Sequence, residues 1–160
     1  MNIGLLISEP YKGVRVLELT PDGLHQLYEY RTGLEQMAFK ALWHKRTAAS
    51  FDDLDQRHAH LLEAIDAGDG ALAIDRELAL HQWCYELSGN PLLLDAWSRI
   101  KPHLQCYFVL HQRAHKRAGP ARQSHDSYLE HAKGDSLEAT LAYIARHMKQ
   151  GFEQVIQTLG

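Results

Sequence analysis

The stretch ELALHQWCYELSGNPLL, residues 77–93, contains the end of one helix and the start of the next. Its apolar residues recur at three- and four-residue steps up to Ser88 and Gly89, a pair typical of a helix C-terminus. Asn90 then provides an N-cap, and Pro91 suits the first helical position. The segment therefore predicts two consecutive helices joined by a tight turn, which is the basic unit of a helical bundle.

The same signals continue in both directions along the chain. They predict six helices with short connections, which together form an all-α, antiparallel bundle of six to seven helices. The predicted helices run from Thr20 and Pro21 to about Lys45, from Ser50 to Gly68, from Asp69 to Leu87, from Asn90 through a bend near Lys101 that Pro102 imposes, from Gly119 and Pro120 to Lys133, and from Asp135 to about Leu159.

Residues 1–19 carry a different pattern. The runs LLIS and VRVLEL flank a turn that contains proline and glycine, which predicts a short β-hairpin. A two-stranded hairpin is only marginally stable in water by itself. We therefore expect it either to pack on the helices or to be the remnant of a larger unit, with residues 20–160 forming the helical domain.

Composition and charge exclude several classes of protein. A chain of 160 residues with 45% hydrophobic residues is suited to one folded domain, and its net charge of -3 is not that of a self-sufficient nucleic-acid binder. Cys84 and Cys106 lie in apolar helical stretches, as free thiols do in a reducing compartment. Because there is neither a secretory signal nor an apolar run of membrane-spanning length, we expect a cytoplasmic protein that does not enter the membrane.

Histidine is unusually frequent, with 11 residues. Glu77 and His81 are four residues apart on one helical face, so they can chelate one metal ion, although an exposed carboxylate–imidazole pair would have the same spacing. His125 and His147 each lie in an apolar helical run, where a histidine is either a ligand or a hydrogen-bonded core residue. These four residues are the candidates for a metal site.

The other histidines are weaker candidates. His111 and His115 are also four residues apart, but they are surrounded by arginine and lysine, which disfavours a divalent ion and predicts a solvated face. His58 and His60 diverge on a helix because they are only two residues apart.

Several segments together resemble one family, the GntR transcription regulators of the FadR type, and in particular their C-terminal effector-binding (FCD) domain. GLLISEPYKGVRVLEL resembles the closing wing of the winged helix, and TPDGLHQLYEYRTGLEQMA is similar to the first effector-domain helix. ELALHQWCYELSGNPLL resembles the helix that carries an acid and a histidine, followed by Ser-Gly-Asn-Pro. His125 and His147 are 22 residues apart, as are the last two ligand histidines of the family. The resemblance covers essentially the whole chain.

The resemblance implies one divalent metal, bound by an acid and three histidines, with open positions for a small carboxylate effector. The corresponding ligands are Glu77, His81, His125 and His147, although the acid in the family is usually aspartate. Zn, Ni, Mn and Fe all suit such a ligand set. Arg31 occupies the position of an arginine that can pair with an anionic effector, but the same arginine can form an ordinary surface pair with Glu35.

The resemblance also implies a homodimer that senses its effector and is not an enzyme. Since the chain starts inside the wing, without the helix-turn-helix that precedes it in the family, we expect no direct DNA binding by this chain alone. Two alternatives stay open. The dipeptide His125-Asp126 also occurs in helical metal-dependent hydrolases, and a metal-free dimerisation fragment would place the same histidines in the core or on the surface.

Overall fold

The computed structural model describes residues 3–9 and 13–159, and it consists mainly of helices. β1 (Ile3–Glu9) and β2 (Gly13–Leu19) pair antiparallel, as the sequence predicted, with Ile3 opposite Leu19. The predicted turn between them lies outside the described residues. The helices are α1 (Pro21–Leu42), the 3-10 helix η1 (Trp43–Lys45), α2 (Ala48–Asp66), α3 (Gly70–Ser88), α4 (Pro91–His115), α5 (Asp126–Ala132) and α6 (Leu137–Ile156).

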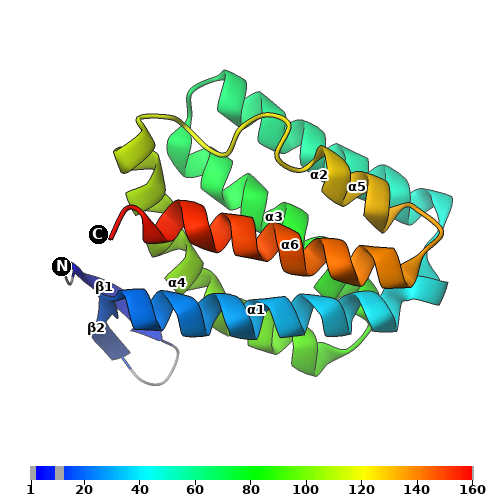
Figure 1. The fold of residues 1–160 in the computed structure, drawn as a ribbon, viewed down its shortest axis with the longest axis horizontal. Coiled ribbons are helices and arrows are strands. Elements are labelled where there is room, and N and C mark those ends of the chain that lie inside the picture. The colour runs from blue at the N-terminus through cyan, green and yellow to red at the C-terminus, as the bar shows by residue number, and fades with distance from the viewer. Residues whose placement is uncertain (1–2, 10–12, 160) are drawn as a thin grey trace.

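The long helices pack as an antiparallel bundle, which confirms the predicted fold class (Figure 1). α1 lies beside α6, α3 packs on α1, α2 and α4, and the short α5 lies near α6. The hairpin lies at the end of the bundle where α1 begins and α6 ends (Figure 1). This arrangement makes α3 the central helix, because it contacts helices on several sides.

Capping explains where the helices begin. Thr20 caps α1, Asp69 caps α3 and Asn90 caps α4, each by accepting a hydrogen bond from a backbone N–H of the first turn, as predicted. The predicted start of α2 was wrong by three residues. Thr47 is the N-cap, and Ser50 completes a capping box at the third helical position, so both side chains satisfy free N–H groups.

The boundary at Ser88 is the one that the quoted stretch predicted. Gly89 follows α3 with φ 70°, a left-handed conformation that favours glycine. A Cβ atom at this position would also lie 2.7 Å from the Lys45 Nζ, which donates to the Ser88 carbonyl. Both facts explain why glycine ends this helix.

Two predictions in the second half of the chain were wrong. Gly119 and Pro120 do not start a helix. The chain makes a series of turns there, and α5 begins only at Asp126 with His125 as its N-cap. α6 is capped by Ser136 rather than Asp135. α4 continues through Pro102 as one helix, and the bend near Lys101 stays a prediction.

The core is rich in aromatic residues. Tyr85 stacks on Trp97 with ring centroids 4.9 Å apart, and Trp83 packs near Phe39. The indole N–H groups of Trp83 and Trp97 are satisfied by the Ser50 carbonyl and by the Gln82 side chain. Such buried aromatic area dominates the hydrophobic stabilisation of a domain of this size.

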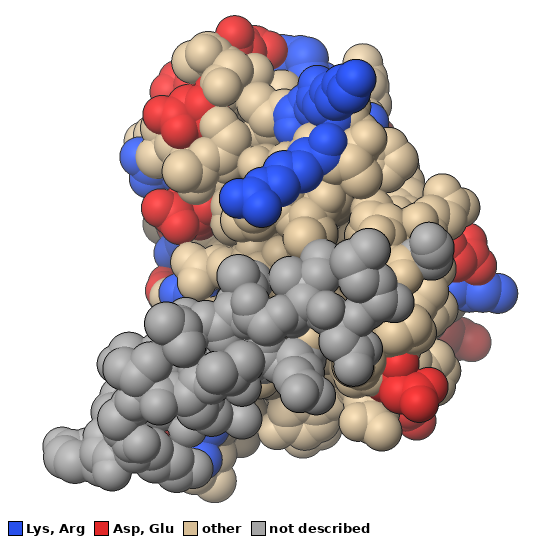
Figure 2. Space-filling view, turned by 90° about the vertical axis from the view of Figure 1, so that its left-hand side faces the viewer, with Lys and Arg blue, Asp and Glu red and all other residues tan. Residues whose placement is uncertain are grey.

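The surface carries charges of both signs. On the end of the molecule that Figure 2 shows, acidic and basic side chains are both present around uncharged areas, in line with the net charge of -3. None of the described helices is long and apolar enough to cross a membrane.

Candidate metal centre

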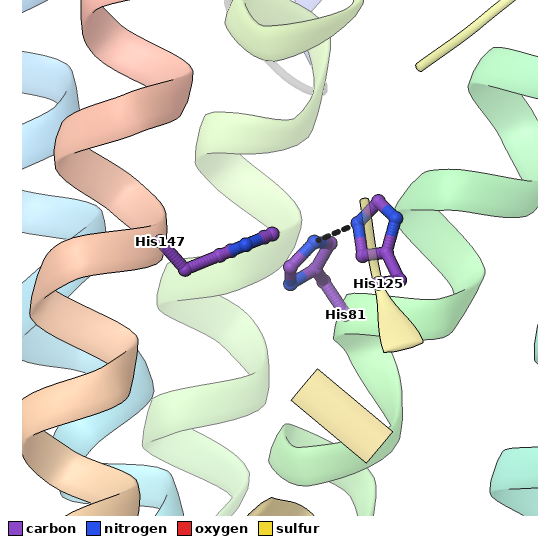
Figure 3. A group of neighbouring side chains, drawn as sticks. All are labelled: His81, His125 and His147. Atoms are coloured by element: carbon purple, nitrogen blue, oxygen red, sulfur yellow. Dashed lines mark hydrogen bonds between the residues drawn. The ribbon is translucent and has the colours of Figure 1, made fainter. Parts of the chain in front are cut away.

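Three histidines from separate parts of the chain meet inside the bundle. His81 comes from α3, His125 from the N-cap of α5, and His147 from α6 (Figure 3). One nitrogen of each ring lies within 4.8 Å of the others, and the His81 Nε2 is 3.2 Å from the His125 Nε2. Among the residues that the structure describes, this is the one group of three or more His, Cys, Asp or Glu side chains close enough to share an ion.

Local structure fixes each ring in place. His81 lies in the middle of the central helix α3 and is fully buried. His125 follows the turns of residues 117–124, and its position at the start of α5 points its ring back towards His81. His147 is only partly buried, and it reaches the group from α6. The site therefore exists only when three helices are packed together.

A different partner holds the Nδ1 atom of each ring. The Glu35 Oε1 lies 2.8 Å from the His81 Nδ1, and the Ser124 hydroxyl lies 3.0 Å from the His125 Nδ1. The Tyr143 hydroxyl lies 3.4 Å from the His147 Nδ1. Histidines that bind metals usually have such a partner on the second ring nitrogen, because it fixes the tautomer and the orientation of the ring. The Nε2 atoms are thus the ones available for an ion.

Burial keeps the three imidazoles neutral. It is the largest cause that lowers the pKa of His81 and His125 well below the usual value, and of His147 to about 3. The Arg31 charge lowers the pKa of all three rings further. At neutral pH each ring therefore carries a lone pair, which is the form that binds a metal.

Glu77 lies beside this group. Its Oε1 is 3.7 Å from the His125 Nε2, and its side chain is 16% exposed. Burial raises the pKa of Glu77 to about 7, against the opposing effects of Arg31 and Arg117. The predicted acid is thus next to the three histidines but outside the tight group that they form.

Arg31 is buried rather than on the surface. Its side chain is 3% exposed, and its Nε lies 3.9 Å from the Glu35 Oε2, so the two residues are paired in the interior and the alternative of an ordinary surface pair does not hold. Neither of these two atoms has a hydrogen-bond partner among the described residues. Buried polar atoms without a hydrogen bond are costly, so both atoms could take part in further polar contacts.

A cavity of about 250 Å³ lies between α1, α3, α4 and α6 and opens on these groups. Its lining includes Arg31, Glu77 and the three histidines. His111 also lines it and is 92% buried, since its exposed fraction is 8%. The expectation that His111 and His115 form a solvated face was therefore wrong for His111, although His115 is exposed.

Sequence reasoning missed Glu35, Ser124 and Tyr143 as partners of the histidines. Glu35 had a signal, its four-residue spacing from Arg31, but that spacing predicted only a pair between the two. Ser124 directly precedes His125, and Tyr143 is one turn before His147. No spacing distinguishes these contacts from those of ordinary surface residues.

Asp126 does not join the histidine group. Its side chain is 55% exposed, and its Oδ1 lies 3.8 Å from the His58 Nε2. A His-Asp pair in a hydrolase would hold one ion with both side chains. Here the two neighbouring side chains diverge, so the dipeptide gives the hydrolase alternative no support.

Comparison with known proteins gives matches over most of the chain. The FCD domain family matches residues 26–150. Among solved structures, E. coli McbR/YncC superposes with a TM-score of 0.75 at 21% identity, over 95% of this chain and 77% of that one. A GntR family transcriptional regulator from Pseudomonas syringae pv. tomato str. DC3000 superposes with a TM-score of 0.73 at 18% identity, over 97% of this chain and 64% of the other. No curated protein matches the sequence.

Proposed function

Because this chain belongs to the FCD domain family, the effector-binding domain of GntR-type transcription regulators, we propose that it senses a small carboxylate at a divalent metal ion. The histidines would hold the metal, a carboxylate would bind next to it, and α1 would change its packing in response. Each part of the proposal is supported by a different feature of the site.

The observation that carries the proposal is the convergence of three neutral imidazoles whose Nδ1 atoms all have partners. His81, His125 and His147 would hold the ion. The donor set fits, because neutral imidazoles suit Zn, Ni and Fe, and carboxylate oxygens suit Mn as well, so the residues alone do not select one metal. Glu77 is the candidate for a fourth ligand.

Bound there, the ion would supply positive charge and exchangeable coordination positions for a carboxylate group. Arg31 lines the same cavity, its Nε has no hydrogen-bond partner, and its guanidinium can make a charge-assisted contact with an anion. A cavity of about 250 Å³ suits a ligand with few atoms. The effector is therefore a small carboxylic acid.

The response would involve α1. This helix carries Arg31 and Glu35, and it directly follows the hairpin that resembles a wing. An effector changes the packing of α1 only if it binds one arrangement more tightly than the other. We propose that α1 transmits this difference towards residues 1–19 and, in a homodimer, to a DNA-binding unit.

A metal-free dimerisation fragment is the alternative. It would place three neutral imidazoles around one point with no ion for them to bind. The cavity beside the imidazoles, which Glu77 and Arg31 also line, disfavours this alternative.

The test is metal binding by the purified, chelator-treated chain. Zn or Ni titration should give about one equivalent per chain and raise the melting temperature. A carboxylate such as acetate or citrate should then perturb the spectrum of the Co-loaded protein, and Arg31→Gln should weaken that effect. The matched control is Arg99→Gln on the exposed face of α4, where the side chain is 77% exposed. Absence of both metal uptake and a thermal shift would refute the proposal.

A further inference from the structure

We propose that Glu35 is a positioning residue for the metal centre: its carboxylate fixes the proton of His81 on Nδ1 and thereby presents the Nε2 lone pair to the ion. The inference rests on the proposed function, and it adds a residue that is itself too far from the Nε2 atoms to be a ligand. It also assigns a purpose to a fully buried carboxylate in the middle of α1.

The contacts of Glu35 define the proton positions. Its Oε1 accepts a hydrogen bond of 2.5 Å from the Tyr128 hydroxyl and lies 2.8 Å from the His81 Nδ1. An ionised carboxylate can only accept hydrogen bonds. Tyr128 donates one to this oxygen, and His81 must therefore donate a second one from its Nδ1. The proton of neutral His81 then resides on Nδ1, and its Nε2, 3.2 Å from the His125 Nε2, carries the lone pair.

Burial raises the pKa of the Glu35 carboxyl, and the Arg31 charge and the hydrogen bond from Tyr128 oppose this effect. A buried carboxylate without a counter-charge is strongly unfavourable, and the Arg31 Nε lies 3.9 Å from the other carboxylate oxygen. Both charged side chains are almost completely buried, at 3% and 0% exposure. The same arginine that can meet an effector thus also neutralises the carboxylate behind His81.

Glu35 differs from the partners of the other two histidines. Ser124 and Tyr143 offer hydroxyls, which can donate or accept and therefore fix no tautomer by themselves. A carboxylate only accepts, and a hydrogen bond from imidazole to carboxylate increases the donor strength of the ring. A carboxylate thus fixes the proton of His81 on Nδ1. Because the His81 Nε2 then accepts, the His125 Nε2, 3.2 Å away, is the donor in the metal-free chain.

The first test needs no substitution. In the metal-free, ¹⁵N-labelled chain, long-range ¹H–¹⁵N spectra distinguish the two neutral tautomers of an imidazole. We expect His81, assigned by through-bond correlations, to be in the Nδ1–H form, which is the minor form of free histidine. An Nε2–H form of His81 would overturn the proposal, whatever the metal affinity is.

The second test is Glu35→Gln, with Zn affinity measured by competition with a chelator. Removal of a partner of this kind typically costs 10–100-fold in metal affinity, so we expect a weakening in that range at unchanged 1:1 stoichiometry. Glu29→Gln is the matched control, because it removes the same charge from the exposed face of α1. Circular dichroism checks that both variants are folded.

The outcomes separate this inference from the proposed function. A wild-type chain that binds no Zn contradicts the proposed function, while the tautomer of His81 still decides the role of Glu35. Wild-type Zn affinity in a folded Glu35→Gln variant contradicts the role of Glu35 and leaves the metal site intact. If Glu35→Gln does not fold, the tautomer of His81 in the wild-type chain decides the question, and an Nε2–H form of His81 overturns the inference.

Discussion

His81 and Trp83 are two residues apart on α3 and almost equally buried, at 0% and 1% exposure, yet their surroundings differ completely. Trp83 faces apolar and aromatic side chains and makes one hydrogen bond through its indole N–H. His81 faces Glu35, His125 and His147. One face of α3 thus packs into the hydrophobic core, and the other lines the candidate site.

The difference between the two faces shows how this fold divides its tasks. Apolar burial on the Trp83 side stabilises the bundle, because each buried aromatic side chain contributes a large hydrophobic free energy. The His81 side buries charges and imidazoles whose desolvation offsets most of the gain from their hydrogen bonds. We therefore expect changes on the two sides to have different consequences for stability and for binding.

The largest effect should come from the core side. Trp83→Ala removes a fully buried indole, and we expect the free energy of unfolding to fall by about 3–5 kcal/mol. Urea denaturation followed by circular dichroism measures this loss. Trp83→Phe should recover part of it, since it keeps aromatic packing near Phe39 but loses the hydrogen bond to the Ser50 carbonyl. A loss below about 1 kcal/mol for Trp83→Ala would contradict this assignment of the core.

The next effect should come from the site side and should depend on metal. His147→Ala removes one proposed ligand, so the melting temperature should fall much more in the metal-loaded protein than in the stripped protein. Saturation at 100 times the Kd stabilises a folded state by about 2.7 kcal/mol, which sets the scale of the difference. Scanning calorimetry with and without Zn measures it. Equal losses in both forms would show that His147 acts only through packing.

A smaller effect should appear in the pH dependence of the metal-free protein. The folded-state pKa values of His81, His125 and His147 lie below those of the unfolded chain, so only the unfolded chain takes up protons as the pH falls below about 6.5. The free energy of unfolding should therefore fall as the pH decreases from about 6.5 to 4.5. Glu77, with its pKa raised to about 7, opposes this trend because its folded form keeps a proton that the unfolded form loses.

His147→Gln makes this pH prediction specific. It should reduce the slope of unfolding free energy against pH by at most about 1.4 kcal/mol per pH unit, the limit for one titrating group. Chemical denaturation at several pH values gives the slope. His60→Gln is the control, since His60 is exposed on α2. An identical slope in wild type and His147→Gln would contradict the lowered pKa of His147.

The smallest effect should come from a surface pair that belongs to neither side of α3. Arg122→Ala breaks a contact with both oxygens of Asp66, but these side chains are 47% and 58% exposed. Such pairs contribute about 0.2–1 kcal/mol, and salt screens them. We expect a loss in that range at low salt, which should shrink at 1 M NaCl. A loss of several kcal/mol would mean that the turns before His125 depend on this pair.

The sequence predicted most of the helices correctly because their signals are local. The Thr20, Asp69 and Asn90 caps act within one turn of backbone, and the apolar periodicity marks the buried face. Failures occurred where two local signals compete. Ser50 is a good cap by itself, but Thr47 caps three residues earlier and uses Ser50 in its capping box. Likewise, Pro120 suits a helix start, yet the chain makes turns until Asp126.

What the sequence determined alone was the set of candidate ligands. The spacing of Glu77 and His81 places both on one face of a helix, and apolar helical runs singled out His125 and His147. Resemblance to the effector-binding domain joined these residues into one ligand set and added Arg31. The tertiary structure decided which of them meet. It brings the three histidines together, leaves Glu77 beside them, and buries Arg31 against Glu35.

The partners of the histidines were also decided only by tertiary packing. Glu35 and His81 are 46 residues apart in the chain, and no periodicity within one helix reports a contact between two helices. Caps and apolar periodicity determine where a helix begins and ends and which of its faces is apolar, because they involve residues only a few positions apart. The tautomer and the orientation of a buried imidazole depend on the group that packs against it. The role of Glu35 could therefore be inferred only from the tertiary structure.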